Sequence, residues 1–398
     1  FLNQCTDLEK LDSIISKKSI SAYIGFDCTA SSLHVGSLLQ IMILRLLQKH
    51  GHRPIVLLGG GTTMIGDPSG KDSTRKILKQ QDIRNNILSI KKLFKKLLSF
   101  KNKKTKPIFV DNYSWLGKLN YIEFLRNIGS QFTLNKMLTY DSVKSRLDRE
   151  QSLSYMEFNY MILQAFDFYK LFKKEKCLLQ LGGSDQWGNI INGVDLIRRV
   201  LQKDAFGLTS PLITLSSGAK MGKTEKGAVW LDEKLFTSYE YWQFWRNTDD
   251  GDVVKFLKFF TDINIEELKN LQEKKNINDL KIILANETTK IMHGKIKSLK
   301  AEKIASDLFK YGKINKDLPT KKIYKKDIEA GIKLLDLLVT NDIMYSKSEV
   351  RRAIKNNGIK INDILVQDEN RELNFSDFRD NNIKVSFGKK KHYLFELI

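Results

Sequence analysis

Cysteine and proline are scarce in this chain of 398 residues. It has three cysteines and five prolines, and the cysteines (Cys5, Cys28 and Cys177) stand far apart without any C-x-x-C pair. Because disulfide frameworks and zinc sites need paired or clustered cysteines, neither is expected, and no structural metal is predicted. The scarcity fits a reducing compartment, so the sequence predicts a cytoplasmic protein.

Long apolar runs are also missing. No run approaches the roughly 20 residues that a membrane-spanning helix needs, so we expect no membrane partner. The first residues lack the basic and apolar blocks of a secretory signal, and the absent initiator methionine leads us to expect a short preceding segment. Hydrophobic residues make up 41% of the chain and charged residues 28%, which is typical of a globular protein with two or three domains.

Acidic residues are outnumbered: 46 Asp and Glu face 67 Lys and Arg, for a formal net charge of +21. Two explanations stay open at this point. A polyanionic partner such as a nucleic acid would favour such a balance. A chain rich in Lys, Asn and Ile and poor in proline would also arise from an AT-rich genome.

Strand and helix patterns alternate in the first half of the chain. Residues 21–26 and 54–58 read as buried strands, and apolar residues recur at helical spacing across 33–49 between them. This is a βαβ unit with parallel strands. Short apolar runs at 107–110 and 178–181 extend the pattern. The sequence predicts an α/β fold with a Rossmann-like, doubly wound parallel sheet, which binds ligands at the carboxyl ends of its strands.

The composition changes after Trp230, where the sequence becomes mostly helical in pattern and poor in glycine. We predict a Rossmann-like domain over 1–235, a helical domain over 236–311, a Lys-rich linker over 312–327 and a small α+β domain over 328–398.

The last of these domains is centred on a predicted helix over 346–355. Asn356-Asn357-Gly358 follow it, and then a predicted strand over 359–362. A glycine directly after a helix is typical of a C-terminal cap, so we expect Gly358 to end this helix.

Two distant segments carry the strongest signal for chemistry. The first is Leu33-His34-Val35-Gly36-Ser37, and the second is Lys220-Met221-Gly222-Lys223-Thr224. A histidine at a helix start lies where backbone N–H groups favour a phosphate, and two lysines on a glycine-containing loop can close over a triphosphate. The segments resemble the HIGH and KMSKS signatures of class I aminoacyl-tRNA synthetases, which implies ATP-dependent adenylation.

Further segments make the resemblance more specific. Residues 59–71, 160–167, 180–188 and 388–393 are similar to bacterial-type tyrosyl-tRNA synthetases, so the likeness covers nearly the whole chain. It implies a ligase that activates tyrosine with ATP and transfers it to the 3′ end of tRNA(Tyr). It also implies Mg²⁺ on the phosphates, an anticodon-side helical domain, an S4-like RNA-binding domain and a homodimer. The apolar, aromatic stretch 115–132 is a candidate interface.

The resemblance also implies roles for individual residues. Those that act on the phosphates during catalysis are Thr29, His34, Lys220 and Lys223. Those that bind tyrosine are Tyr23, Asp67, Tyr160, Gln164, Asp167, Gln180 and Gln186. Those that bind ATP are Gly25, Asp27, Gly36, Ser37, Gly183, Asp185 and Met221.

The chemistry of the reaction fits these residue types. A tyrosine carboxylate is already ionised at neutral pH, so catalysis rests on positioning and on cations near the developing charge. Tyr160, Gln164 and Asp167 are spaced i, i+4 and i+7, so one helix face presents all three. A buried carboxylate that accepts a hydrogen bond from a phenol is left unpaired by phenylalanine, and this family is itself the standard example of such discrimination.

Three basic patches are candidates for RNA contact. One is a cluster on a single helical face: Lys347, Arg351, Arg352 and Lys355. Another is Lys389, Lys390 and Lys391 near the chain end. The third, 91–106, has eight lysines and no acid, and both tRNA backbone contact and a solvated, compositionally biased segment stay open for it.

Two positions depart from the family pattern. Ser37 stands where a second histidine is usual, and Cys28 stands where proline is common; we expect the thiol only to pack. Two rivals remain. One is a tryptophan-specific relative, which shares the fold, and the other is a non-catalytic RNA-binding protein that has kept the fold, which only Ser37 supports. Tyr23 and Asp167 favour a phenol over an indole.

Overall fold

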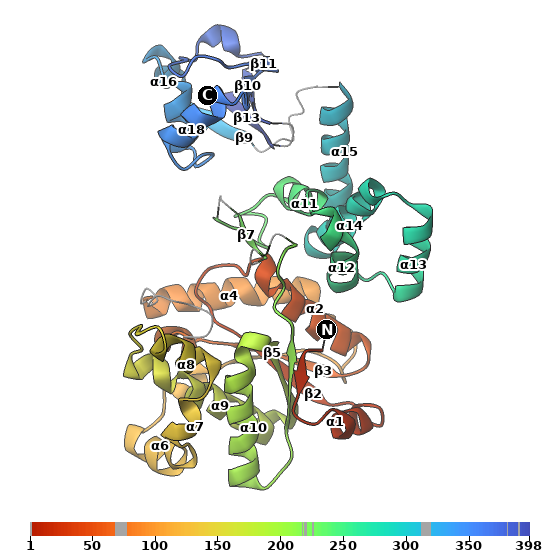
Figure 1. Cartoon of the computed structure of the whole chain (residues 1–398), viewed down its shortest axis with the longest axis vertical. Helices are drawn as coiled ribbons and strands as arrows, with labels where there is room; N and C mark the ends of the chain where they lie inside the picture. The colour runs from red at the N-terminus through yellow and green to blue at the C-terminus, as the bar shows by residue number, and fades with distance from the viewer. Residues whose placement is uncertain are drawn as a thin grey trace. The chain divides into compact units, whose positions relative to one another are not determined.

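The computed structural model describes residues 2–67, 78–216, 218, 221–224, 227–311, 320–379, 381–388 and 391–398 (Figure 1). The chain divides into two compact units, Phe1–Thr214 and Leu215–Ile398.

The first unit contains a mostly parallel sheet with the strand order β1-β6-β5-β2-β3-β4. Only the β1–β6 pair is antiparallel among the described pairs of this sheet. The strands are β1 (Gln4–Cys5), β2 (Ser21–Phe26), β3 (Arg53–Leu58), β4 (Ile108–Asp111), β5 (Cys177–Gly183) and β6 (Phe206–Ser210). The predicted strands at 21–26, 54–58, 107–110 and 178–181 correspond to β2, β3, β4 and β5, so the predicted α/β fold is confirmed.

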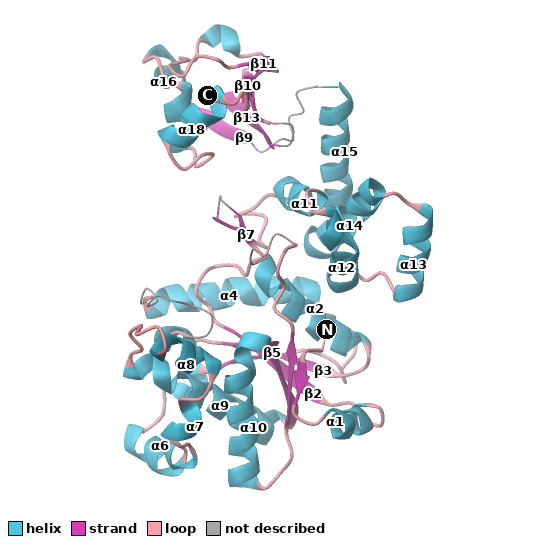
Figure 2. Cartoon of the chain, viewed as in Figure 1, coloured by secondary structure: helices cyan, strands magenta, loops and turns pink. Residues whose placement is uncertain are grey.

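Helices cover both faces of this sheet. Figure 2 shows α9 and α10 on one side and α2 on the other, and α9 packs along α10 and β5. The helices are α1 (Leu8–Ile15), α2 (Leu38–Lys49), α3 (Thr62–Ile65), α4 (Gln80–Leu97), α5 (Tyr113–Leu116), α6 (Tyr121–Asn127), α7 (Leu134–Met137), α8 (Asp141–Leu147), α9 (Tyr155–Glu175) and α10 (Trp187–Leu201). Short 3-10 turns lie at Val35–Ser37, Gly129–Gln131 and Ser184–Gln186.

Local chemistry fixes the start of the long helix α9. The Ser154 side chain accepts a hydrogen bond from the Glu157 backbone N–H, and the Glu157 carboxylate accepts one from the Ser154 backbone N–H. This capping box satisfies two N–H groups that would otherwise lack partners at the helix start. It thereby fixes where this helix begins, and the helix carries Tyr160, Gln164 and Asp167.

The second unit begins with a short hairpin and a helical array. The hairpin pairs β7 (Lys223–Thr224) with β8 (Gly227–Ala228). The helices are α11 (Ser238–Arg246), α12 (Asp250–Phe260), α13 (Ile265–Lys274), α14 (Ile277–His293) and α15 (Lys295–Tyr311). Aromatic rings form the core, because Trp245 contacts Phe256 and Phe260 at centroid distances of 5.9 and 5.0 Å. The prediction that this region is mostly helical is confirmed.

The C-terminal part of the second unit has its own sheet and core. Its strand order is β11-β10-β12-β13-β9. The strands are β9 (Thr320–Ile323), β10 (Ile359–Ile361), β11 (Ile364–Leu365), β12 (Asn382–Phe387) and β13 (Lys391–Leu397). The helices are α16 (Lys325–Glu329), α17 (Leu334–Thr340) and α18 (Lys347–Lys355), and a 3-10 turn lies at Phe375–Asp377. The predicted α+β texture is confirmed.

The predicted linker needs a correction in its second half. Residues 312–319 lie outside the described residues. Residues 320–327 do not link domains, because β9 pairs in parallel with β13 and α16 follows directly. Ile323 and Ile328 are buried in the same core. Since Ile323 is the one buried residue in β9, the strand has too little apolar character to be recognised from the sequence.

The end of α18 also differs from the prediction. The residue in the left-handed conformation is Asn357, with φ of 53°, and not Gly358. The Asn357 N–H donates to the Ile354 carbonyl and the Gly358 N–H to the Ala353 carbonyl, which is the Schellman pattern. A Cβ on Gly358 would lie 3.0 Å from the Ala353 carbonyl oxygen, so the glycine provides room for this close approach.

Candidate active site

The predicted site residues of the first unit gather where its parallel strands end. Asp27 follows β2, Gly59 follows β3, and Gly183 ends β5. The Thr62 hydroxyl donates to Asp27 Oδ1 at 3.0 Å, and a Cβ on Gly59 would lie 2.5 Å from that same oxygen. A side chain at this position would therefore displace the Asp27 carboxylate and the Thr62 hydroxyl. This edge is where doubly wound sheets bind ligands.

A fully buried carboxylate lies beside this edge. Asp167 Oδ2 accepts a hydrogen bond from Asn112 Nδ2 at 2.8 Å, and Oδ1 accepts one from Trp115 Nε1 at 2.7 Å. Burial raises the pKa of Asp167 to about 7, although both donors act against this shift. Two neutral donors thus hold a carboxyl group that titrates near neutral pH.

Tyr23 completes what we call the Asp167 cluster: Tyr23, Asn112, Trp115 and Asp167. The Tyr23 ring packs on Phe168 at a centroid distance of 5.3 Å. Burial, reinforced by the charge of Asp167, raises the pKa of Tyr23 well above its usual value. Its hydroxyl has no hydrogen-bond partner among the described residues.

Gln180 adds a second unsatisfied polar atom beside the cluster. It is the residue of β5 that pairs in register with Tyr23 on β2, and it is 1% exposed. Its Oε1 atom likewise lacks a partner within the part of the chain that the structure describes. Since buried polar groups are normally satisfied, Tyr23 and Gln180 together fit a polar ligand.

Asn112 and Trp115 are site residues that the sequence prediction missed. Both follow β4 at its carboxyl end, in the same layer as Asp27 and Gly59. Asn112 Nδ2 also donates to the Thr62 hydroxyl at 3.0 Å, which links the cluster to Asp27. Their position could have indicated them, because Asn112 comes directly after the strand β4 and Trp115 lies in the short helix α5 that follows.

Other predicted tyrosine contacts lie around this network. The Tyr160 hydroxyl is 3.5 Å from both carboxylate oxygens of Asp27. A residue predicted to bind tyrosine therefore lies next to a residue predicted to bind ATP. Gln164 is half-buried on the same helix, between Tyr160 and Asp167. Asp67 accepts a hydrogen bond from Gln186 at 2.9 Å, which joins the loop after β3 to the start of α10.

The first signature forms a cap at the start of a 3-10 turn. His34 Nδ1 accepts a hydrogen bond from the Gly36 backbone N–H at 3.0 Å. An imidazole whose Nδ1 is an acceptor carries its proton on Nε2, which is then a donor. Ser37 precedes α2, and its side chain makes no capping hydrogen bond within the described residues. Thr29, which precedes His34 in the chain, is exposed.

The remaining predicted ATP contacts are backbone sites or exposed side chains. Gly25 is exposed within β2, and Asp185 is exposed in the turn after β5. A Cβ on Gly183 would lie 2.6 Å from Asp185 Oδ1, so a larger residue at this position would displace the Asp185 side chain. Cys28 is buried, and its thiol lies 3.6 Å from the Phe26 carbonyl oxygen, in agreement with the predicted packing role.

The second signature is described only in part. Lys220 lies outside the described residues, and Lys223 is described only through its backbone in β7. Met221 is buried, and Gly222 has a φ of 91°, which favours glycine. The roles predicted for the two lysines stay predictions.

The basic residues of α18 are exposed, and most of them are paired with acidic side chains. Lys347 pairs with Asp336, and Glu369 lies 3.7 Å from Arg351 Nε and 3.3 Å from Lys355 Nζ. Arg352 is also exposed. We call Lys347, Arg351, Arg352 and Lys355 the α18 surface. Lys389 and Lys390 lie outside the described residues, and Lys391 is described only as backbone.

The third basic patch is also on the surface. Its lysines are exposed except for Lys91, which is half-buried with its Nζ 5.6 Å from the centre of the Phe109 ring. Both explanations of this patch stay open.

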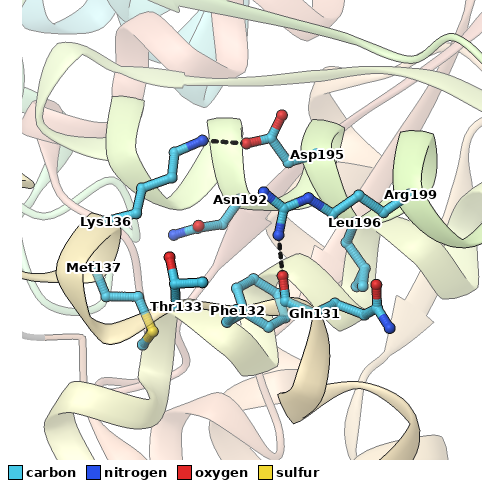
Figure 3. Close-up of a pocket in the computed structure, with 9 residues that line it drawn as sticks. All are labelled: Gln131, Phe132, Thr133, Lys136, Met137, Asn192, Asp195, Leu196 and Arg199. Atoms are coloured by element: carbon cyan, nitrogen blue, oxygen red, sulfur yellow. Dashed lines mark hydrogen bonds and ion pairs between the residues drawn. The ribbon is translucent and has the colours of Figure 1, made fainter.

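A depression of about 240 Å³ lies between α7 and α10 (Figure 3). Lys136 pairs with Asp195 across it, and Arg199 donates to the Gln131 carbonyl. None of the predicted site residues lines it. Within the described ranges, no helix is long and apolar enough to cross a membrane, and no group of three or more His, Cys, Asp or Glu side chains is arranged to hold a metal ion.

The fold is that of a class I aminoacyl-tRNA synthetase. Residues 16–310 match the family of class I tRNA synthetases (W and Y), and residues 311–395 match the tyrosine–tRNA ligase SYY-like C-terminal domain. The chain therefore belongs to the class I tyrosyl-tRNA synthetase family, as the motifs predicted.

Individual relatives agree with this membership. The chain is 61% identical to a tyrosine–tRNA ligase of Pelagibacter ubique, over 100% of this chain and 97% of the relative. It is 52% identical to a tyrosine–tRNA ligase of Rickettsia massiliae, over 99% and 97%. A C-terminally truncated mitochondrial tyrosyl-tRNA synthetase of Aspergillus nidulans has a similar structure, with a TM-score of 0.68 and 30% identity over 77% of this chain and 91% of that one.

Proposed function

We propose that this chain is a tyrosine–tRNA ligase that works in two steps. In the first, a carboxylate oxygen of tyrosine bonds to the α-phosphorus of ATP, and the bond to pyrophosphate breaks. In the second, a ribose hydroxyl at the 3′ end of tRNA(Tyr) attacks the carbonyl carbon of tyrosyl-adenylate. An ester forms, AMP leaves, and the hydroxyl loses its proton. ATP, tyrosine and tRNA are the substrates of this family.

The Asp167 cluster carries the choice of tyrosine. A phenol hydroxyl that donates to Asp167 and accepts from Tyr23 would satisfy the buried Tyr23 hydroxyl. The Asn112 and Trp115 donors already fix the carboxylate in place. Phenylalanine would leave the Tyr23 hydroxyl unpaired and would give Asp167 no hydrogen bond beyond those from Asn112 and Trp115, which costs free energy relative to tyrosine.

The other end of tyrosine binds beside Asp67. We assign its ammonium group to Asp67, Tyr160 and Gln164, and its carboxylate to the neighbourhood of Gln180 and Gln186. The Asp67–Gln186 hydrogen bond, which holds the Gln186 NH₂ group beside Asp67, supports this assignment.

The ATP phosphates bind at the first signature, with the adenosine beside the strand ends. His34, a neutral donor at the start of a 3-10 turn, faces phosphate together with Thr29, and Lys220 and Lys223 act on the triphosphate from their loop. Adenosine is bound by Gly25, Asp27, Gly36, Ser37, Gly183, Asp185 and Met221. ATP would enter as its magnesium complex, in which Mg²⁺, bound mainly through phosphate oxygens and water, would offset the negative charge of the phosphates.

The S4-like domain holds tRNA through the α18 surface and residues 389–391. Exposed cations next to acidic partners exchange those partners for phosphates, so the contact is weak per residue and salt-dependent. We keep the division into a catalytic domain over 1–235 and an anticodon-side domain over 236–311 as part of this proposal, together with a cytoplasmic location.

The active form is proposed to be a homodimer. Large apolar side chains are exposed on α6, on α7 and its C-terminal cap, and at the start of α9: Tyr121, Ile122, Leu134, Leu138 and Tyr155. The hydroxyls of Tyr121 and Tyr155 are 3.0 Å apart, so α6 and α9 contribute to one patch. Such a patch is typical of a protein–protein interface. Sedimentation of the wild type and of Ile122→Glu tests this, with a dimer and a monomer expected.

Charging of tRNA(Tyr) tests the whole proposal. We expect the purified chain to attach radiolabelled tyrosine, and neither tryptophan nor phenylalanine, to a tRNA(Tyr) transcript in the presence of ATP and Mg²⁺. Attachment of tryptophan would overturn the substrate assignment.

A further inference from the structure

Three polar side chains form a hydrogen-bonded row at the start of α10. Asn189 Nδ2 donates to Gln186 Oε1 at 3.1 Å, and Gln186 Nε2 donates to Asp67 Oδ2 at 2.9 Å. Asn189 is 4% exposed, whereas Gln186 is only partly buried. The row therefore runs from a fixed, buried amide to a carboxylate at the strand ends.

The direction of these hydrogen bonds follows from chemistry alone. An ionised carboxylate can only accept, so Gln186 must turn its NH₂ group toward Asp67. Its Oε1 atom then faces Asn189 and needs a donor, which Asn189 Nδ2 supplies. The last torsion of a glutamine side chain has no strong preference of its own, so the partners decide which way the amide points.

This direction matters for the activation step. The Gln186 NH₂ group has two hydrogens, and only one is used by Asp67. The other is available to an anionic oxygen of the substrate, either on the tyrosine carboxylate or on the α-phosphate. A reversed amide would instead present the lone pairs of Oε1 to that oxygen and to Asp67, and would repel both.

We propose that Asn189 is a positioning residue for tyrosine activation, which holds the Gln186 amide with its NH₂ group toward Asp67 and the anionic substrate. This rests on the proposed function and assigns to it a residue that does not itself touch the substrate. Asn189 acts only through Gln186, so its effect must vanish when Gln186 has no amide.

A neighbouring asparagine provides a matched control. Asn192 lies on the same helix, is 3% exposed, and accepts a hydrogen bond from the Tyr140 hydroxyl at 3.1 Å. It has no bond to Gln186 among the described contacts. Asn192→Ala therefore measures the cost of losing a buried amide from α10 without disturbing the row.

The test measures single-turnover adenylate formation and thermal unfolding for variants of the full chain. Asn189→Ala should slow adenylate formation about tenfold, the effect of one hydrogen bond. Asn189→Asp should slow it further, because a carboxylate at 189 attracts the Gln186 NH₂ group and turns Oε1 toward Asp67. Residue 189 is in the first turn of α10, where an acidic side chain suits the helix dipole, so this variant is expected to fold.

The controls decide between positioning and a structural role. Asn192→Ala should lower the melting temperature but leave the rate unchanged, and Asn189→Ser, which keeps a donor, should be faster than Asn189→Asp. In a Gln186→Ala background, Asn189→Ala should have no further effect on the rate.

Several outcomes would overturn the inference. They are additive effects of Asn189→Ala and Gln186→Ala, an Asn192→Ala rate as slow as that of Asn189→Ala, and an Asn189→Asp rate equal to or above that of Asn189→Ser. If Asn189→Ala does not fold, the comparison of Asn189→Asp with Asn189→Ser still decides. Absence of adenylate formation by the wild type would instead overturn the proposed function itself.

Discussion

The Asp167 cluster and the α18 surface use polar side chains under opposite conditions. In the cluster the carboxylate of Asp167 is fully buried, and the Tyr23 hydroxyl is buried without a partner among the described residues. On the α18 surface Lys347, Arg351 and Lys355 are exposed and already paired with acids. The first arrangement suits a small ligand that completes a fixed set of bonds, and the second suits a large polyanion that replaces many weak ones.

This difference predicts how each region responds to change. A single altered atom in the Asp167 cluster leaves a buried group unpaired, which costs about 1–3 kcal/mol. A single altered charge on the α18 surface removes one solvent-exposed pair, which is worth about 0–1 kcal/mol. Effects in the cluster should therefore be large and insensitive to salt, and those on the surface small, cumulative and salt-dependent.

The largest effect should follow removal of the whole C-terminal sheet. The shortened chain should end after Tyr311, so that the cut does not fall within β9 or α16. This truncation should reduce tRNA charging about a thousandfold at physiological salt, because several phosphate contacts are lost together. Tyrosine-dependent pyrophosphate exchange should persist. Measuring both half-reactions checks this, and equal charging by the shortened chain would show that the domain does not hold tRNA.

The next effect concerns the choice of amino acid. Asp167→Asn should lower the preference for tyrosine over phenylalanine by about 10- to 100-fold, since a charged acceptor for the phenol is lost. The ratio of kcat/KM values in pyrophosphate exchange measures it. Asp204→Asn, at an exposed carboxylate paired with Lys10, is the matched control and should leave the ratio unchanged. A ratio that stays constant in Asp167→Asn would remove this residue from the specificity site.

A smaller effect is expected from pH. Since the pKa of Asp167 is about 7, kcat/KM for tyrosine should fall about tenfold between pH 8 and pH 6, as the carboxyl is protonated and stops accepting from the phenol. For folding the sign is opposite. The folded chain holds this proton more tightly than the unfolded chain does, so the stabilisation is complete below about pH 4 and is lost as the pH rises through about 7.

The same variant tests both pH effects. Asp167→Asn should flatten the pH profile for tyrosine exchange and the matching part of the unfolding curve. A profile for Asp167→Asn that still falls between pH 8 and pH 6 would assign the titration to another group.

The smallest effect should come from the acidic partner on the α18 surface. Glu369→Gln releases Arg351 and Lys355, so tRNA affinity should rise about two- to fivefold at low salt, and the gain should shrink as salt increases. Fluorescence anisotropy of labelled tRNA over a salt series checks this. Weaker binding by Glu369→Gln would mean that the acid holds the cations in a productive geometry.

The sequence predicted elements well where apolar character was strong. β2 and β3 are nearly continuous buried runs, and α9 carries its three site residues at clear helical spacing. β9 escaped prediction because Ile323 is its one buried residue, and the α18 cap because asparagine replaces glycine in the left-handed position.

The sequence could predict site residues only where they belong to segments that resemble a known family. Tyr23 and Asp167 belong to segments that resemble a family, so they could be assigned from the sequence. Asn112 and Trp115 follow a short, half-buried strand, and their link to Asp167 exists only once β4 and α9 are packed in the same fold. The acids that pair with the α18 surface lie on other segments of the chain. The spacing of residues along one helix could therefore not predict them.

The measurement that tests the account most directly is ATP–pyrophosphate exchange by the wild-type chain with one amino acid at a time. We expect exchange with tyrosine and none with tryptophan or phenylalanine at equal concentration. Exchange with tryptophan would mean that the Asp167 cluster selects an indole. No exchange with any amino acid would mean that the chain keeps the synthetase fold without its activity.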